Sequence, residues 1–158
     1  MLKTAHEDLF VLSAAKAGLI YLTPNDWSLI ADKASRVNFK AGEAIVKRGR
    51  RTPGVYLILK GTASVHIPSQ TASKAIGAGE ICGELSFLDE LPASASVIAD
   101  GAVEAYYLDR PALTSLFELF PHLASRFYRS LATNLSRRLR GVIDPAPAPG
   151  TASADGKK

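Results

Sequence analysis

The feature that most constrains the fold is a series of short apolar runs between residues 36 and 108, each followed by turn residues. Glycine and proline at positions such as Gly49, Pro53 and Gly54 interrupt regular structure and mark the turns. Many short strands with this spacing are typical of a small antiparallel barrel or roll, so the chain is expected to be mainly β. The runs are 37–39, 44–46, 55–59, 62–67, 95–99 and 103–108.

Two helices are expected before this region. Residues 6–20 form an apolar-rich pattern that is expected to end near Gly18, and the acidic residues at its start suit the positive end of a helix dipole. Thr23 and Pro24 predict the start of a second helix, since threonine is a favoured N-cap and proline fits the first helical position. Trp27 in this helix is interpreted as a packing anchor.

Two more helices are expected after the strands. Asp109 is a favoured N-cap and predicts a helix that ends at Phe120. The longest helix is expected at 122–140, with Gly141 as its end, because it carries an apolar stripe at four-residue steps. The residues of the stripe are Leu123, Phe127, Leu131, Leu135 and Leu139.

Composition limits the class of protein. The chain has 158 residues, 47% of them hydrophobic, which is enough for one compact domain. The single cysteine, Cys82, excludes an internal disulfide and a cysteine-rich metal site, and it fits a reducing cytoplasm. No apolar run reaches the ~18 residues of a membrane-spanning helix. Residues 142–158 have little to bury and are expected to be a disordered tail. We find no motif for a catalytic triad, a P-loop or a metal ion, so an enzyme or a cofactor is not expected.

The stretch 82–99 carries the motif that indicates a binding site. A Gly-rich turn at 77–83 is followed by one expected helical turn at 84–88, by Pro92, by small residues and by a strand. Backbone N–H groups at such a turn and helix start converge on one point and can hold an anion. Glu84 can accept hydrogen bonds from sugar hydroxyls, so a phosphorylated ribose suits this arrangement.

This stretch resembles the phosphate-binding cassette of cyclic nucleotide-binding domains. The cassette consists of Gly-Glu, an apolar, a small and two apolar residues, a spacer, Pro-Arg, two small residues, and Ser or Thr before Val. Ala93 replaces the arginine, which in the family pairs with the cyclic phosphate. The residues that fit are Gly83, Glu84, Leu85, Ser86, Phe87, Leu88, Pro92, Ser94, Ala95, Ser96 and Val97.

The resemblance covers about residues 6–140 and implies an α+β, mainly β fold. This fold is an eight-stranded β-roll or jelly roll with helices at both ends, similar to the sensor half of Crp/Fnr regulators. The implied division is N-terminal helices at 1–34, a roll at 35–109 with its cassette at 79–99, C-terminal helices at 110–141, and the tail.

The resemblance implies a stand-alone regulatory domain that binds cyclic AMP, cyclic GMP or a related signalling nucleotide and signals through its C-terminal helix. Arg48, Arg50 and Arg51 either reach into the site in place of the missing arginine or are surface charges. The alternative function, favoured by Ala93, is a ligand-independent interaction or dimerisation module. The implied ligand-binding residues are Gly83, Glu84, Leu85, Ala93, Ser94, Ala95 and Ser96.

The stripe of 122–140 predicts a helix that packs on the core, pairs with a second copy, or does both. A homodimer through Phe127, Leu131 and Leu135 is expected. The net charge of +4 is concentrated in the same segment, which is interpreted as a solvated helix face. Specific DNA binding is not expected, because a helix-turn-helix domain needs about 60–80 further residues after Arg140.

Overall fold

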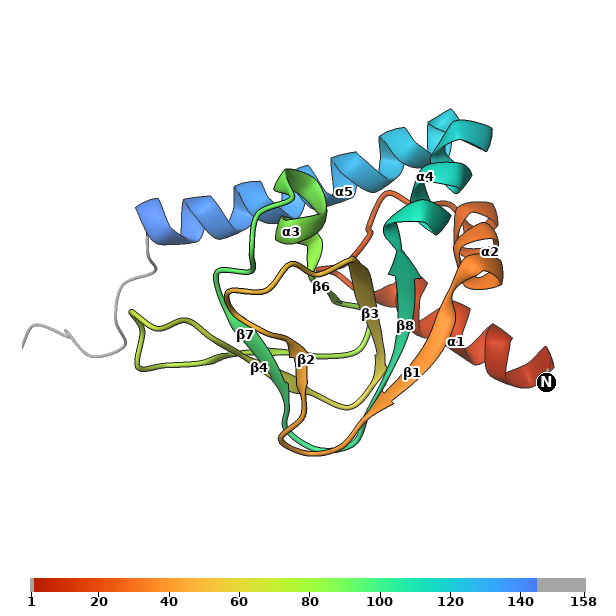
Figure 1. Ribbon diagram of the computed structural model, residues 1–158. Helices are drawn as coiled ribbons and strands as arrows, with labels where there is room; N and C mark the ends of the chain where they lie inside the picture. The colour runs from red at the N-terminus through yellow and green to blue at the C-terminus, as the bar shows by residue number, and fades with distance from the viewer. Residues whose placement is uncertain (1, 145–158) are drawn as a thin grey trace, which may run out of the picture.

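The computed structural model describes residues 2–144 and arranges them in three layers (Figure 1). Helices cover one face of a four-stranded sheet, and a second four-stranded sheet covers its other face. The helices are α1 (Leu2–Ala14), α2 (Pro24–Lys33), α3 (Glu84–Asp89), α4 (Arg110–Leu119) and α5 (Pro121–Ile143). The strands are β1 (Ser35–Phe39), β2 (Ala44–Val46), β3 (Gly54–Lys60), β4 (Ala63–His66), β5 (Lys74–Ile76), β6 (Ile81–Cys82), β7 (Ser96–Ala99) and β8 (Val103–Asp109).

The expected roll of eight strands is confirmed within the described residues. One sheet has the order β1-β8-β3-β6 and the other β2-β7-β4-β5, and every strand pair is antiparallel. Strand β3 lies inside the first sheet and is buried on both faces. Val55, Leu57 and Leu59 pack toward the helices, whereas Ile58 packs against the second sheet. Its continuous apolar sequence follows from this two-sided burial.

Two strands were not expected from the sequence. The Gly-rich turn at 77–83 includes the two-residue strand β6, and strand β5 lies in the segment between the expected runs 62–67 and 95–99. Both strands are too short for an alternating pattern to be recognised. Gly79 accounts for the tight turn between them, since its φ of +83° is a conformation that side chains rarely adopt.

Helix α1 begins and ends earlier than the pattern of 6–20 predicts. It stops at Ala14, and the following segment passes Gly79 so closely that a Cβ at Gly18 would overlap the Gly79 carbonyl group. Gly18 therefore permits a close backbone contact and does not end the helix.

The acidic residues near the start of α1 do not serve the helix dipole, since the first turn of the helix contains none. Asp8 is instead buried, forms an ion pair with Arg36 and accepts a 2.8 Å hydrogen bond from the hydroxyl of Tyr106. Burial and this hydrogen bond raise the pKa of Tyr106 to about 12. The contact fastens α1 to β1 and β8.

Helix α2 begins as predicted. The hydroxyl of Thr23 accepts from the Asp26 N–H, and the Asp26 carboxylate accepts from the Thr23 N–H, which together form a capping box. Trp27 is 2% exposed and lies in the core between helices and sheet, so its interpretation as a packing anchor is confirmed.

Helix α5 crosses the molecule above the roll (Figure 1). It starts at Pro121, one residue before the expected start at 122. It continues through Gly141, where it was expected to end, to Ile143. Gly141 does not end the helix, because a single glycine inside a helix costs only about 1 kcal/mol relative to alanine. Of the expected tail, residues 145–158 lie outside the described residues.

The apolar stripe of α5 packs inside its own chain. Phe127 and Leu131 are at most 1% exposed and belong to the core, while Leu135 is half-buried. Phe127 and Leu131 therefore cannot contribute to the expected dimer interface, because the helices and the first sheet already cover them, whereas the homodimer itself stays a prediction. Beyond them, the exposed apolar residues of α5 include Leu139 and Val142.

A row of polar side chains, spaced one helical turn apart beside this stripe, binds α5 to the N-terminal segment. Arg126 donates two hydrogen bonds, of 2.6 and 2.8 Å, to the carboxylate of buried Asp26. One turn later, the Ser130 hydroxyl accepts a hydrogen bond from the Tyr21 N–H. A further turn on, the side-chain amide of Asn134 donates to the carbonyl of Gly18.

Leu131→Ala tests the packing of α5 against the core. Removing a buried leucine side chain leaves a cavity, so the free energy of unfolding should fall by about 2–5 kcal/mol in a denaturant titration. Leu139→Ala on the exposed part of the same helix should change it by less than about 0.5 kcal/mol. Equal effects of the two substitutions would contradict this position of the helix.

Asp26→Asn tests the ion pair at the start of α5. The hydrogen bonds from Arg126 lower the pKa of Asp26, so the carboxylate stabilises the fold above its usual pKa of about 3.9. This contribution is lost as the pH falls through the lowered pKa. The difference in unfolding free energy between wild type and Asp26→Asn should thus be largest near neutral pH and shrink below about pH 4. A difference that stays constant from pH 7 to pH 2 would contradict the assignment.

Candidate functional site

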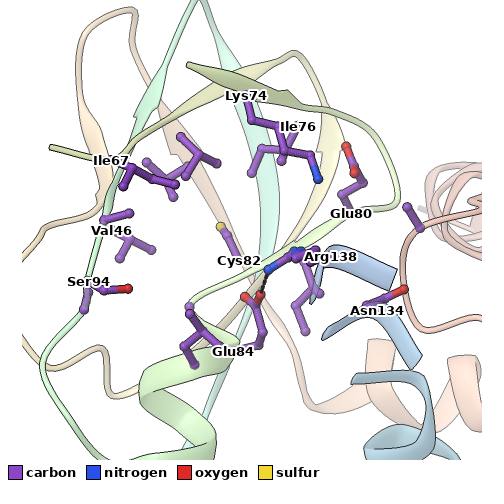
Figure 2. A pocket seen from close by; sticks show the side chains of 18 of the residues that line it. Val46, Ile67, Lys74, Ile76, Glu80, Cys82, Glu84, Ser94, Asn134 and Arg138 are labelled. Carbon is purple, nitrogen blue, oxygen red and sulfur yellow. Dashed lines mark hydrogen bonds and ion pairs between the residues drawn. The ribbon is translucent and has the colours of Figure 1, made fainter. Parts of the chain in front are cut away.

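A cavity of about 540 Å³ lies between the second sheet, the stretch 82–97 and the last turns of α5 (Figure 2). Most of its wall is apolar, with Val65 from β4, Ile76 from β5 and Val97 from β7 as examples. Several polar residues also line it. Those from the strands and their loops are Gln70, Lys74, Glu80 and Ser94, and those from the helices are Glu84, Ser86, Asn134, Arg137 and Arg138.

The structure brings together six of the seven residues that the resemblance implied. Ser96 does not line the cavity; its hydroxyl accepts a 3.0 Å hydrogen bond from the Arg48 N–H. The residues that line the cavity are Gly83, Glu84, Leu85, Ala93, Ser94 and Ala95.

Gly83 shapes the entry to α3. It adopts a φ of +83° immediately before the helix, and an added Cβ would lie 3.1 Å from both the Gly54 carbonyl oxygen and the Thr52 methyl group. The left-handed backbone and the close contacts both disfavour a side chain at this position. As a result, the backbone turns sharply and places Glu84 in the cavity wall.

Glu84 is buried and forms an ion pair with α5. Its Oε1 accepts a 2.7 Å hydrogen bond from Nη1 of Arg138 (Figure 2). The carboxylate side chain is 7% exposed and the arginine 41%. A residue 54 positions later in the chain thus completes this part of the site.

Cys82 also lines the cavity, but its thiol is not activated. Burial raises the pKa of the Cys82 thiol, and the neighbouring carboxylate of Glu84 raises it further. The group is therefore protonated near neutral pH and acts as a small apolar side chain.

The loop before the cassette does not supply the missing cation. Arg48, Arg50 and Arg51 are exposed and do not line the cavity, so their interpretation as surface charges is confirmed. The backbone of Ala93 forms two hydrogen bonds with this loop, one to the carbonyl of Arg50 and one from the N–H of Gly49. The loop and the cassette are thus held together through main-chain groups.

Sequence reasoning missed the residues that α5 and β5 contribute. Arg138 was interpreted only as part of a solvated helix face, and Asn134 and Lys74 were not singled out. The one available signal was the group of arginines at 126–140, but a linear pattern does not reveal which arginine points into a cavity.

The comparisons with known proteins agree with this geometry. A sequence model described as cyclic nucleotide-binding domain matches residues 36–119, just over half of the chain. The chain belongs to the cyclic nucleotide-binding domain family. The family is regulatory and not catalytic.

Two curated relatives are 32% identical to the chain. Cyclic GMP-binding protein C of Dictyostelium discoideum matches over 130 residues, which are 75% of this chain and 5% of that protein. Cyclic AMP receptor protein of Thermus thermophilus matches over 123 residues, which are 75% of this chain and 55% of that protein. The chain therefore spans only part of the length of these relatives.

A solved structure confirms the fold. A cyclic nucleotide-binding domain from Methylobacillus flagellatus superposes with a TM-score of 0.74 and 23% identity, over 90% of this chain and 82% of that one. In residues 2–144, none of the helices has the length and apolar character needed to cross a membrane.

Gly83→Ala tests the entry to the cassette. A left-handed conformation costs a residue with a Cβ about 1–2 kcal/mol, and the contact with the Gly54 carbonyl adds to this. We expect at least this loss in the free energy of unfolding, measured with denaturant. Gly101→Ala is the matched control, since nothing lies within 4 Å of its added Cβ. An equal response of both variants would refute the role of Gly83.

Proposed function

We propose that this domain binds a cyclic nucleotide in the cavity and reports its presence through α5. The observation that carries the proposal is the ion pair between Glu84 and Arg138, because it joins the cassette of a nucleotide-binding family directly to the C-terminal helix. A change at the ligand site therefore acts on the last turns of α5 without an intervening element.

The cavity suits a ligand of this class. Its volume of about 540 Å³ falls in the range of small-molecule sites, and its apolar walls with a few polar groups are typical of them. The apolar walls contact the base, the carboxylate of Glu84 accepts from ribose hydroxyls, and the hydroxyl of Ser94 donates to phosphate. Gly83, Leu85, Ala93 and Ala95 shape the pocket, while Ser96 supports it through Arg48.

Cyclic AMP and cyclic GMP are both candidate ligands. One relative is named for cyclic GMP binding and another for cyclic AMP reception, and the chain is 32% identical to each. A regulatory role without catalysis, a cytoplasmic location and the absence of specific DNA binding belong to the same proposal. The location rests on the single free thiol of Cys82.

The second candidate function is a ligand-independent dimerisation or interaction module. Ala93 favours it, since the pocket lacks the arginine that the family uses for the phosphate. The exposed end of α5 also favours it, because Leu139, Val142 and Ile143 are each at least 60% exposed. A dimer through α5 involves these residues and Leu135. Sedimentation of the wild type as a monomer at all concentrations would exclude the homodimer.

Ala93→Arg separates the two functions. It places a guanidinium where the family has its phosphate anchor, and a charge-assisted hydrogen bond contributes ~1.5–3 kcal/mol. Calorimetry should therefore show cyclic AMP or cyclic GMP binding that is tightened by at least about tenfold. Adding Glu84→Gln should reverse much of the gain, because an amide accepts hydrogen bonds from ribose less strongly than a carboxylate.

The matched control is Ala102→Arg, which adds the same charge at an exposed turn residue outside the cavity. It should leave nucleotide binding unchanged. If neither nucleotide binds to the wild type or to folded Ala93→Arg, the sensor function is excluded and the interaction module is preferred.

A further inference from the structure

The cassette of this chain contributes no positive charge to the cavity, because position 93 is alanine. The cations among the described lining residues come from other elements. Lys74 begins strand β5, whereas Arg137 and Arg138 lie in the last turns of helix α5. A phosphate in this cavity must therefore be neutralised from outside the cassette.

Arg138 differs from the other two cations in how it is held. Its Nη1 donates to Glu84 Oε1 at 2.7 Å, and this carboxylate is itself buried. Arg137 donates only to the main-chain carbonyl of Lys16, and no hydrogen bond or ion pair of Lys74 orients its side chain among the described residues. Of the three, Arg138 is the cation that a buried partner orients within the wall of the cavity.

A guanidinium has five N–H donors in a planar fork. The described residues use one of them on Arg138, in the bond to Glu84. A fork of this kind can bind a carboxylate with one edge and a phosphate with the other. Figure 2 shows the head group of Arg138 beside Glu84 and Cys82, in the part of the wall that the cassette forms.

We propose that Arg138 is the phosphate-binding residue of this domain and takes the place of the arginine that is absent at position 93. The proposal rests on the proposed function and identifies the residue that performs it. Glu84 orients the guanidinium, and the free N–H groups bind the anionic oxygens of the cyclic phosphate. The ligand then contacts the cassette and helix α5 at the same time, so that binding holds the end of the helix against the roll.

Arg138→Gln tests the proposal by calorimetry with cyclic AMP and cyclic GMP. Losing a charge-assisted bidentate contact should weaken binding of the better ligand by about ten- to a hundredfold. Arg140→Gln is the matched control, because Arg140 is exposed on the same helix and does not line the cavity. It should bind within twofold of wild type. Arg138→Gln that binds within twofold of wild type would overturn the proposal.

Two further variants keep the test decisive if the unpaired Glu84 destabilises Arg138→Gln. Arg138→Lys retains a positive charge for Glu84 but lacks the second edge of donors, so it should also weaken binding, by at least threefold. Ala93→Arg combined with Arg138→Gln should recover the lost affinity, because it restores one guanidinium to the cavity. Unchanged affinity in Arg138→Lys, or no recovery in a folded double variant, would contradict the role of Arg138.

The outcomes also separate this inference from the proposed function. If wild type binds a nucleotide and Arg138→Gln binds it within twofold of wild type, Arg138 does not supply the cation and only this inference fails. If wild type binds neither nucleotide, both fail. If wild type binds and Arg138→Gln loses affinity, both are supported.

Discussion

The position of helix α5 depends on a row of polar contacts that recurs about every four residues. Arg126, Ser130, Asn134 and Arg138 lie one turn apart, and each bonds to a partner far away in the sequence. The first three hold the segment before the roll, and the last holds the cassette. Because this row adjoins the buried apolar stripe, the contacts and the stripe together fix how the helix is rotated about its axis. The cavity depends on this orientation, because residues of α5 form part of its wall.

Polar contacts of this kind specify geometry more than they add stability. Removing two charges from water costs nearly as much as their attraction returns, so a buried ion pair adds little to net stability. Leaving one partner unpaired is far more costly. Among the described residues, no buried side-chain nitrogen or oxygen lacks a hydrogen-bond partner. Competing placements of α5 would leave Asp26 or Glu84 without its arginine, and this penalty selects the observed one.

Local chemistry made much of the fold predictable from the sequence. Turn residues and short apolar runs indicated the roll, Thr23 and Asp109 marked helix starts, and the motif around Gly83 located the cassette. Each of these signals lies within a few neighbouring residues. The ends of α1 and α5 were less predictable, because Gly18 contacts the roll instead of ending α1, and because a single glycine costs too little to end α5 at Gly141.

The site was only half predictable for the same reason. The residues of the cassette are adjacent in the sequence, whereas Arg138 joins them from 54 positions away. Periodicity identifies the buried side of a helix, but it does not say what the polar side faces. Phe127 and Leu131 illustrate the limit: their stripe was recognised, but the surface that covers it belongs to the same chain and not to a second copy.

The approach of Gly18 to Gly79 gives the N-terminal segment an unusual mechanical character. Main chain meets main chain there, with no side chain between them that could change rotamer and absorb a displacement. The carbonyl of Gly18 is also the acceptor for Asn134 of α5. A shift of the helix along its axis is therefore not absorbed by side-chain rearrangement at this contact. It passes directly to the turn between β5 and β6, which makes the N-terminal segment a rigid link between the helix and the strands of the cavity.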